Sequence, residues 1–166
     1  MVGPVVAQDT EPEAEVIPET LDWSFWFPSG VKQVDGTPVS YKQLEDKVVA
    51  IYFSAHWCPP CRRFVPVLQK LYDKHKNKLE IVFVSVDHSP ATKERYIKES
   101  KMSWLTIDFQ SEDSDRLIGG LGIQTFPTLV VLNDDAKIIT MDGYPQLSQA
   151  PDEAWKYWAQ YLDVTE

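Results

Sequence analysis

The sequence predicts an α/β domain in which a mixed central β-sheet carries helices on both faces. Two continuous apolar runs, at residues 47–55 and 80–87, are typical of central strands buried on both sides. A helical pattern separates them, and this order of strand, helix and strand implies a right-handed parallel crossover. Residues 127–143 then contain two strands joined by a tight turn, which we expect to pair antiparallel and so to make the sheet mixed.

The segment before the first buried strand divides into several parts. Residues 1–20 are rich in Glu, Pro and Val without a period, which predicts a flexible acidic tail ahead of a domain at residues 21–166. The aromatic stretch LDWSFWF, residues 21–27, is expected to pack in the core or to form an edge segment. Valines around a central Asp-Gly pair predict a hairpin at residues 31–41, and a short helical turn follows at residues 41–47.

Four helices are predicted after the first buried strand. The first runs from Pro59 to about Lys76, and the second, at residues 89–100, has a serine N-cap followed by proline. A short helix within residues 111–123 is ended by two glycines, and a last helix at residues 150–162 has proline and acidic residues in its first turn. The apolar face of the first comprises Phe64, Val67, Leu68, Leu71 and Tyr72, and that of the last Ala154, Trp155, Trp158, Ala159 and Leu162.

Composition limits the class of protein. A chain of 166 residues with 43% hydrophobic residues fits one domain, whose core does not need disulfides to fold. The net charge of −9 argues against nucleic acid or an anionic membrane surface as partner, since both attract basic patches. No apolar run approaches the roughly 18 residues of a membrane span, so we expect no membrane insertion. We expect a monomer that needs neither cofactor nor metal.

The sequence leaves the cellular compartment open. No basic n-region precedes an apolar h-region, so a full signal peptide is missing. Residues 1–7 end on a small residue, Ala7, ahead of an acidic stretch, as the end of a signal segment would. We expect a cytoplasmic protein if the chain is complete, and a periplasmic or secreted one if residues 1–7 are the remnant of a signal peptide.

Both cysteines lie in the stretch AHWCPPCRR, residues 55–63, where the first buried strand ends and a helix begins. In α/β proteins this end of a strand is where ligands and chemistry are found. The N-terminus of a helix favours a thiolate, through its unpaired N–H groups and dipole, so Cys58 is the predicted nucleophile. Cys61 lies one turn further on the same face and can attack a mixed disulfide formed at Cys58.

The two prolines between the cysteines fit this interpretation. Pro59 and Pro60 cost little in a first helical turn, where their missing N–H groups would be unpaired. The N–H of Cys61 is then the first one that can reach the Cys58 sulfur. A zinc site is an alternative, but it needs four ligands and the motif supplies two, without an HxxxH pair elsewhere. A structural disulfide is a second alternative, but closing so short a loop removes little chain entropy and would stabilise the fold little. Inert cysteines are a third alternative, but the end of a strand is a poor position for them.

These residues resemble the thioredoxin superfamily. WCPPCR, residues 57–62, is similar to the WCxxC active-site motif. Pro66 resembles the proline that kinks the thioredoxin helix. The FPT stretch at residues 126–128 resembles the cis-proline loop opposite the dithiol. The stretches YFSAHWCPPCRRFVPVLQKLYDK, EIVFVSVD and MSWL resemble the tryparedoxin/nucleoredoxin branch, over roughly residues 30–145. Exported bacterial thioredoxin-like reductases share much of this pattern and are the rival branch.

The resemblance implies a thioredoxin fold with an N-terminal extension and a thiol–disulfide oxidoreductase that reduces protein disulfides. Cys58 is the implied nucleophile and Cys61 the resolving residue, and the partners are a disulfide-containing protein and a thiol electron donor. A redox-sensing protein-binding module with little turnover is the alternative function. The residues expected to contact substrate are Trp57, Pro59, Pro60, Phe126 and Pro127.

One position departs from ordinary thioredoxins. Six residues before Cys58 they carry a buried aspartate that helps deprotonate the second cysteine, whereas this chain, like tryparedoxins, has Tyr52. The proton acceptor for Cys61 is therefore unassigned. Asp87 and His88 follow the second buried strand and are candidates for this role, and the alternative is that they form an exposed loop pair. His56 either tunes the thiolate when protonated or is an ordinary solvated loop histidine.

Overall fold

The computed structural model describes Gly3 and residues 22–162. Apart from Gly3, the predicted acidic tail at residues 1–20 lies outside the described residues. One seven-stranded sheet, in the order β2-β1-β5-β4-β3-β6-β7, forms the centre of the described part. Its strands are β1 (Val31–Gln33), β2 (Pro38–Val39), β3 (Val48–Ser54), β4 (Leu79–Ser85), β5 (Leu105–Thr106), β6 (Thr128–Leu132) and β7 (Ile138–Thr140).

The sheet is mixed, as predicted. The two apolar runs became β3 and β4, which pair in parallel from Val48↔Leu79 to Ser54↔Ser85. On the other side of β3 runs β6, which is antiparallel to it and in turn pairs antiparallel with β7. The predicted tight turn joins these last two strands, because the Ala136 N–H donates to the Asn133 carbonyl at 3.1 Å and the Asn133 N–H donates to the Lys137 carbonyl at 2.9 Å. The Asn133 side chain organises it by accepting the N–H groups of Asp135 and Lys137.

Two of the helices begin directly after a serine that caps their N-terminus. Ser89 caps α3 with its hydroxyl on the N–H of Thr92, and Ser111 caps α4 in the same way on Ser114. The predicted last helix is shorter than expected and ends at Ala159, and an unpredicted helix, α5, precedes it. The helices are α1 (Trp23–Trp26), the 3₁₀ turn η1 (Tyr41–Gln43), α2 (Pro59–His75), α3 (Pro90–Ser100), α4 (Glu112–Gly120), α5 (Gly143–Gln149) and α6 (Pro151–Ala159).

The α5 helix depends on a glycine. A Cβ atom at Gly143 would lie 2.7 Å from the carbonyl oxygen of Leu129 in β6, so only glycine allows α5 to approach the sheet this closely. The sequence of α5 also contains Pro145, and a glycine and a proline two residues apart are typical of a loop. Tertiary packing against β6 therefore decides the conformation of this segment.

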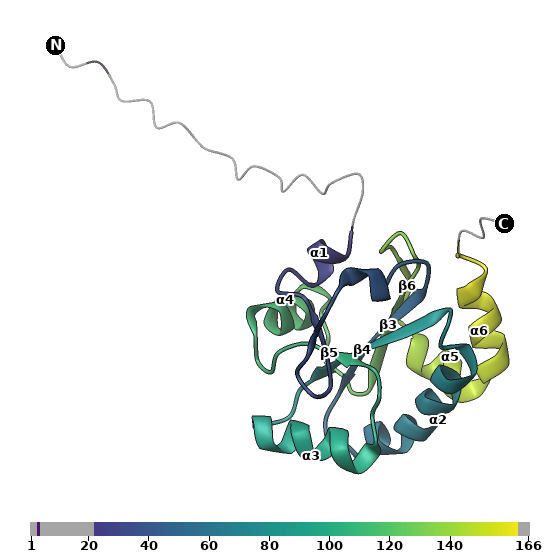
Figure 1. The fold of residues 1–166 in the computed structure, drawn as a ribbon, viewed down its shortest axis with the longest axis horizontal. Helices are drawn as coiled ribbons and strands as arrows, with labels where there is room; N and C mark the ends of the chain where they lie inside the picture. The colour runs from purple at the N-terminus through teal and green to yellow at the C-terminus, as the bar shows by residue number, and fades with distance from the viewer. Residues whose placement is uncertain (1–2, 4–21, 163–166) are drawn as a thin grey trace.

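Two apolar layers cover the sheet. Alternate residues of β3 point to opposite faces, so that Ala50 and Tyr52 join one cluster and Ile51 joins the other. The first cluster is completed by α2, α3, α5 and α6, and the second by α1 and α4. Figure 1 shows α2, α5 and α6 on one side of the sheet and α1 and α4 on the other. Helices on both faces were predicted, and this prediction is confirmed.

The aromatic segment before β1 packs in the core, as one of its two predicted roles required. Trp23, Trp26 and Phe27 are buried against the second face of the sheet. The Trp26 indole donates to the carbonyl of Ala136 at 2.8 Å, which ties α1 to the β6–β7 connection. In the described part of the chain, no helix is both long and apolar enough to cross a membrane.

Candidate active site

Cys58 and Cys61 form a disulfide at the start of α2. Cys58 is the N-cap residue of this helix and Cys61 lies in its first turn, with 5.2 Å between the two Cα atoms. Both are buried, Cys58 being 4% exposed and Cys61 fully covered. The β3 strand delivers the motif to the edge where the parallel strands end, as the sequence predicted.

The prolines leave one N–H facing the Cys58 sulfur. Pro59 and Pro60 are the first two helical residues, and the next residue, Cys61, donates its N–H to Cys58 Sγ at 3.3 Å. This is the hydrogen bond that the sequence predicted. In the reduced protein the same N–H and the positive end of the helix dipole favour a thiolate at Cys58.

A second segment reaches the dithiol from β6. The peptide bond between Phe126 and Pro127 is cis, and the carbonyl oxygen of Phe126 lies 3.7 Å from Cys58 Sγ. Antiparallel pairing places this loop, because the register of β3 and β6 sets Phe53 opposite Thr128. The Thr128 hydroxyl donates to the carbonyl of Thr125 at 2.6 Å, which closes the loop on itself.

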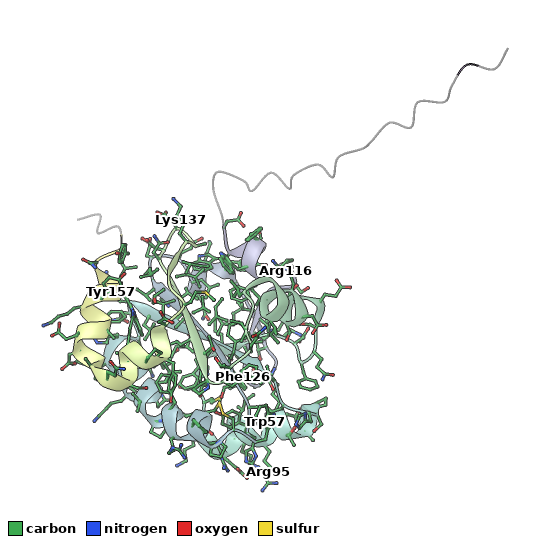
Figure 2. All side chains as sticks on the ribbon, turned by 180° about the vertical axis from the view of Figure 1, so that it is seen from behind. Trp57, Arg95, Arg116, Phe126, Lys137 and Tyr157 are labelled. Carbon is green, nitrogen blue, oxygen red and sulfur yellow. A yellow bond between two sulfur atoms is a disulfide. The ribbon has the colours of Figure 1, made fainter. Side chains whose placement is uncertain are left out.

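Trp57 presents an apolar surface beside the disulfide. Its side chain is 47% exposed, although its indole N–H donates to the carbonyl of Val86 at 3.2 Å. One face of the ring stacks on His88, with centroids 5.7 Å apart, and Phe126 meets it edge-on at 6.1 Å. Figure 2 shows the labelled Trp57 and Phe126 close to the yellow disulfide. The five residues predicted to contact substrate thus lie in two segments that meet at Cys58: Trp57, Pro59 and Pro60 at the start of α2, and Phe126 and Pro127 before β6.

Asp87 and His88 differ in their surroundings. The interpretation as an exposed pair is wrong for Asp87, which is 3% exposed, and correct for His88. The Asp87 carboxylate accepts the N–H of His56 at 2.8 Å and the hydroxyl of Ser85 at 2.6 Å. These bonds join the end of β4 to the turn that follows β3, a contact that the sequence alone does not show.

His56 is held by α3. Its Nε2 lies 2.8 Å from a carboxylate oxygen of Glu99, whose other oxygen accepts from Arg95 at 2.7 Å. These hydrogen bonds lower the pKa of Glu99, the bond from Arg95 contributing most. The ring also meets Tyr96 edge-on. His56 is therefore attached to a neighbouring helix, and the interpretation as a freely solvated histidine is wrong.

Tyr52 occupies the place where thioredoxins carry an acid. Its hydroxyl donates to the carbonyl oxygen of Cys61 at 2.9 Å and lies 3.3 Å from the Tyr96 hydroxyl, which in turn is 2.7 Å from Ser54 Oγ. Burial raises the pKa of both phenols, so they stay protonated at neutral pH. Tyr52 is thus a hydrogen-bond donor to the helix and not a proton acceptor for Cys61.

Sequence reasoning singled out Tyr52 but missed the other two hydroxyls of its hydrogen-bond network, those of Tyr96 and Ser54. Ser54 is two residues away in the same strand, whereas Tyr96 comes from α3, 44 residues further along the chain. A buried tyrosine usually needs a partner for its hydroxyl, which was the available signal. No group of three or more His, Cys, Asp or Glu side chains suited to a metal occurs among residues 22–162.

A family model described as Thioredoxin-like matches residues 46–138, which include the dithiol, α2, β4 and the cis-proline loop. The chain belongs to the thioredoxin-like family. This confirms the predicted fold, and the disulfide between Cys58 and Cys61 agrees with an oxidoreductase of this family.

The relatives of this thioredoxin-like chain come from the predicted branch. Tryparedoxin from Trypanosoma brucei brucei is 36% identical over 72% of the chain and 85% of that protein. Nucleoredoxin from Bos taurus is 38% identical over 76% of the chain, which spans only 31% of that longer protein. The structure of tryparedoxin II from C. fasciculata superposes with a TM-score of 0.71, at 32% identity, over 78% of the chain and 88% of that structure.

Proposed function

We propose that this protein reduces protein disulfides through Cys58 and Cys61. The observation that carries the proposal is the N–H of Cys61 on the Cys58 sulfur, at a helix N-terminus beside a cis-proline loop. The Cys58 thiolate attacks one sulfur of the substrate disulfide, forming a mixed disulfide and releasing one substrate thiol. Cys61 then attacks Cys58 and releases the second thiol. The substrate gains two electrons and two protons, and Cys58–Cys61 becomes a disulfide.

The substrate-contacting residues form what we call the platform: Trp57, Pro59, Pro60, Phe126 and Pro127. Its support is the exposed ring of Trp57 and the approach of the Phe126 carbonyl to Cys58. A peptide around the substrate disulfide would lie on this surface, and a thiol electron donor would return the dithiol to its reduced form. We further propose that residues 21–166 act as the redox domain and residues 1–20 as an acidic tail.

Substitution of each cysteine tests the mechanism. The Cys58→Ser variant is expected to lose insulin-disulfide reduction altogether, because it lacks the attacking sulfur. The Cys61→Ser variant keeps that sulfur but cannot resolve, so it should accumulate mixed disulfides that non-reducing electrophoresis detects. Full activity of the Cys58→Ser protein would refute the mechanism.

A redox-sensing module with little turnover is a second candidate. The burial of Cys58, at 4% exposure, favours it, because a substrate disulfide has little access to the sulfur. The chain spans only 31% of the Bos taurus nucleoredoxin, which agrees with a module that acts as one part of a larger assembly. Turnover with an added dithiol separates the two candidates: sustained turnover supports the reductase, and redox-dependent binding without turnover supports the module.

A further inference from the structure

Asp87 is a buried carboxylate that the proposed sulfur chemistry does not use. It follows the end of β4 and is 3% exposed. The ion pairs found among residues 22–162 do not include it. Burying a carboxylate costs free energy unless hydrogen bonds compensate for the lost water. The hydrogen bonds of Asp87 therefore indicate what this residue holds.

Its two oxygens connect β4 to the loop before the dithiol. One oxygen accepts from the Ser85 hydroxyl at 2.6 Å, and Ser85 Oγ in turn accepts the N–H of Asp87 at 3.1 Å. This pair of bonds fixes the carboxylate against Ser85, the last residue of β4. The other oxygen accepts the backbone N–H of His56 at 2.8 Å. Asp87 is thus a rigid support that reaches the residue before Trp57.

The supported segment is the turn at residues 55–58. Regular pairing of β3 with β4 stops at Ser54, and one more backbone bond follows, from Val86 N–H to the Ser54 carbonyl at 3.0 Å. Beyond it the turn closes on itself, with the Cys58 N–H on the Ala55 carbonyl at 3.2 Å. The bond from His56 to Asp87 then holds the turn where the backbone ladder has ended.

We propose that Asp87 is a positioning residue, which fixes this turn and thereby the direction in which Trp57 presents its ring to a protein substrate. The inference rests on the proposed function. Trp57 is 47% exposed, and its bond to the Val86 carbonyl and its ring contacts with His88 and Phe126 depend on where the turn places its backbone. A displacement of about 1 Å can cost as much as about 100-fold in rate. None of the hydrogen bonds described for Asp87 reaches a sulfur. The positioning should matter for protein disulfides and little for a small one.

The test compares Asp87→Ala with the conservative Asp87→Asn variant. We expect Asp87→Ala to lower kcat/KM for insulin about tenfold, mainly through KM, since it removes the charged acceptor of the His56 N–H together with the bond from Ser85. Reduction of the small disulfide DTNB should change less than about twofold. The Asp87→Asn protein should be close to wild type with both, because its amide oxygen still accepts the His56 N–H. Ser85→Ala keeps the acceptor of the His56 N–H but removes the bond that fixes the carboxylate, so its loss with insulin should lie between wild type and Asp87→Ala.

Amide hydrogen exchange at His56 provides a readout independent of activity. We expect protection in the wild type and in Asp87→Asn, and faster exchange in Asp87→Ala while exchange in β3 is unchanged. Should Asp87→Ala fail to fold, Asp87→Ser replaces it, since the shorter hydroxyl does not reach the His56 N–H.

Three results would overturn the positioning role: equal losses with insulin and DTNB, an Asp87→Asn protein as impaired as Asp87→Ala, or unchanged exchange at His56 in Asp87→Ala. A wild-type protein inactive on both disulfides would instead refute the proposed function. In that case exchange at His56 still decides whether Asp87 holds the turn.

Discussion

Removing the Tyr52 hydroxyl tests whether this buried phenol ties the sheet to the dithiol helix. The Tyr52→Phe variant keeps the ring, which packs against Phe64, Phe83 and Trp104. It loses the bond to the Cys61 carbonyl at 2.9 Å and the longer contact with Tyr96 at 3.3 Å. No cavity forms beyond the volume of one oxygen, so the hydrogen bonds dominate the cost.

The expected loss is about 1–2 kcal/mol of unfolding free energy, because one good buried hydrogen bond is broken and a weaker one with it. Tyr96 retains its bond to Ser54 at 2.7 Å, which keeps the loss at this level. With a urea m-value of about 2 kcal/mol/M, the midpoint should fall by about 0.5–1 M while m itself stays constant. Urea unfolding of the oxidised protein, followed by circular dichroism, measures both quantities.

Tyr96→Phe is the matched comparison. It removes a hydroxyl from the same network but leaves the Ser54 hydroxyl without its 2.7 Å partner, so it should cost at least as much as Tyr52→Phe. The double variant should show a coupling of about 0.5–1 kcal/mol, since the two hydroxyls are in contact. An unchanged urea midpoint in Tyr52→Phe would contradict the reasoning. So would the loss of an ionisation from its pH–rate profile, since that would make Tyr52 the proton acceptor.

Further predictions concern the core and two titrating groups. Leu68→Ala should cost about 2–5 kcal/mol in urea unfolding, because Leu68 is fully buried between α2 and the sheet; a cost below about 1 kcal/mol would contradict this packing. Burial raises the pKa of Glu80 above 4.5, so its contribution to stability is present at low pH and lost as pH rises. Glu80→Gln should therefore gain stability relative to wild type from pH 4 to pH 7, and a constant difference would refute the linkage. Burial lowers the pKa of His75, which stacks on Trp155, below 6.5, so stability falls as pH drops through the lowered value. His75→Gln should be less stable than wild type at pH 7.5, and thermal unfolding should show the difference narrowing by pH 5.

The parts of the fold that could be predicted from the sequence are those with a local signal. The strands β3 and β4 are mostly apolar and are buried along their whole length because both faces of the sheet are covered, and α3 begins at a serine followed by a proline. The two-residue strand β5 is too short to show any alternation of apolar and polar residues. It exists because β4 and β1 provide hydrogen-bond partners on both sides, which only the folded chain supplies.

The candidate site also has a part that could be predicted from a local signal and a part that could not. The spacing of Cys58 and Cys61, and the hydrogen bond between them, follow from the geometry of a first helical turn, so the motif alone was sufficient. The bond between His56 and Asp87 joins residues 31 positions apart, and it forms because the parallel crossover brings the ends of β3 and β4 together. A motif describes the reacting groups, whereas the supports of those groups depend on the register between strands.

The tyrosine at position 52 changes the electrostatics of the dithiol as well as its proton transfer. An aspartate here would be a buried charge or a buried acid with a raised pKa, facing the second cysteine. Tyr52 is neutral and is satisfied by the Cys61 carbonyl and the hydroxyl of Tyr96, so it adds no charge beneath the helix. A neutral neighbour does not oppose a thiolate at either sulfur, whereas a carboxylate would raise the thiol pKa by repulsion. Replacing the acid with a phenol thus gives up a proton acceptor for Cys61 and in return leaves the helix N-terminus as the main influence on the Cys58 thiolate.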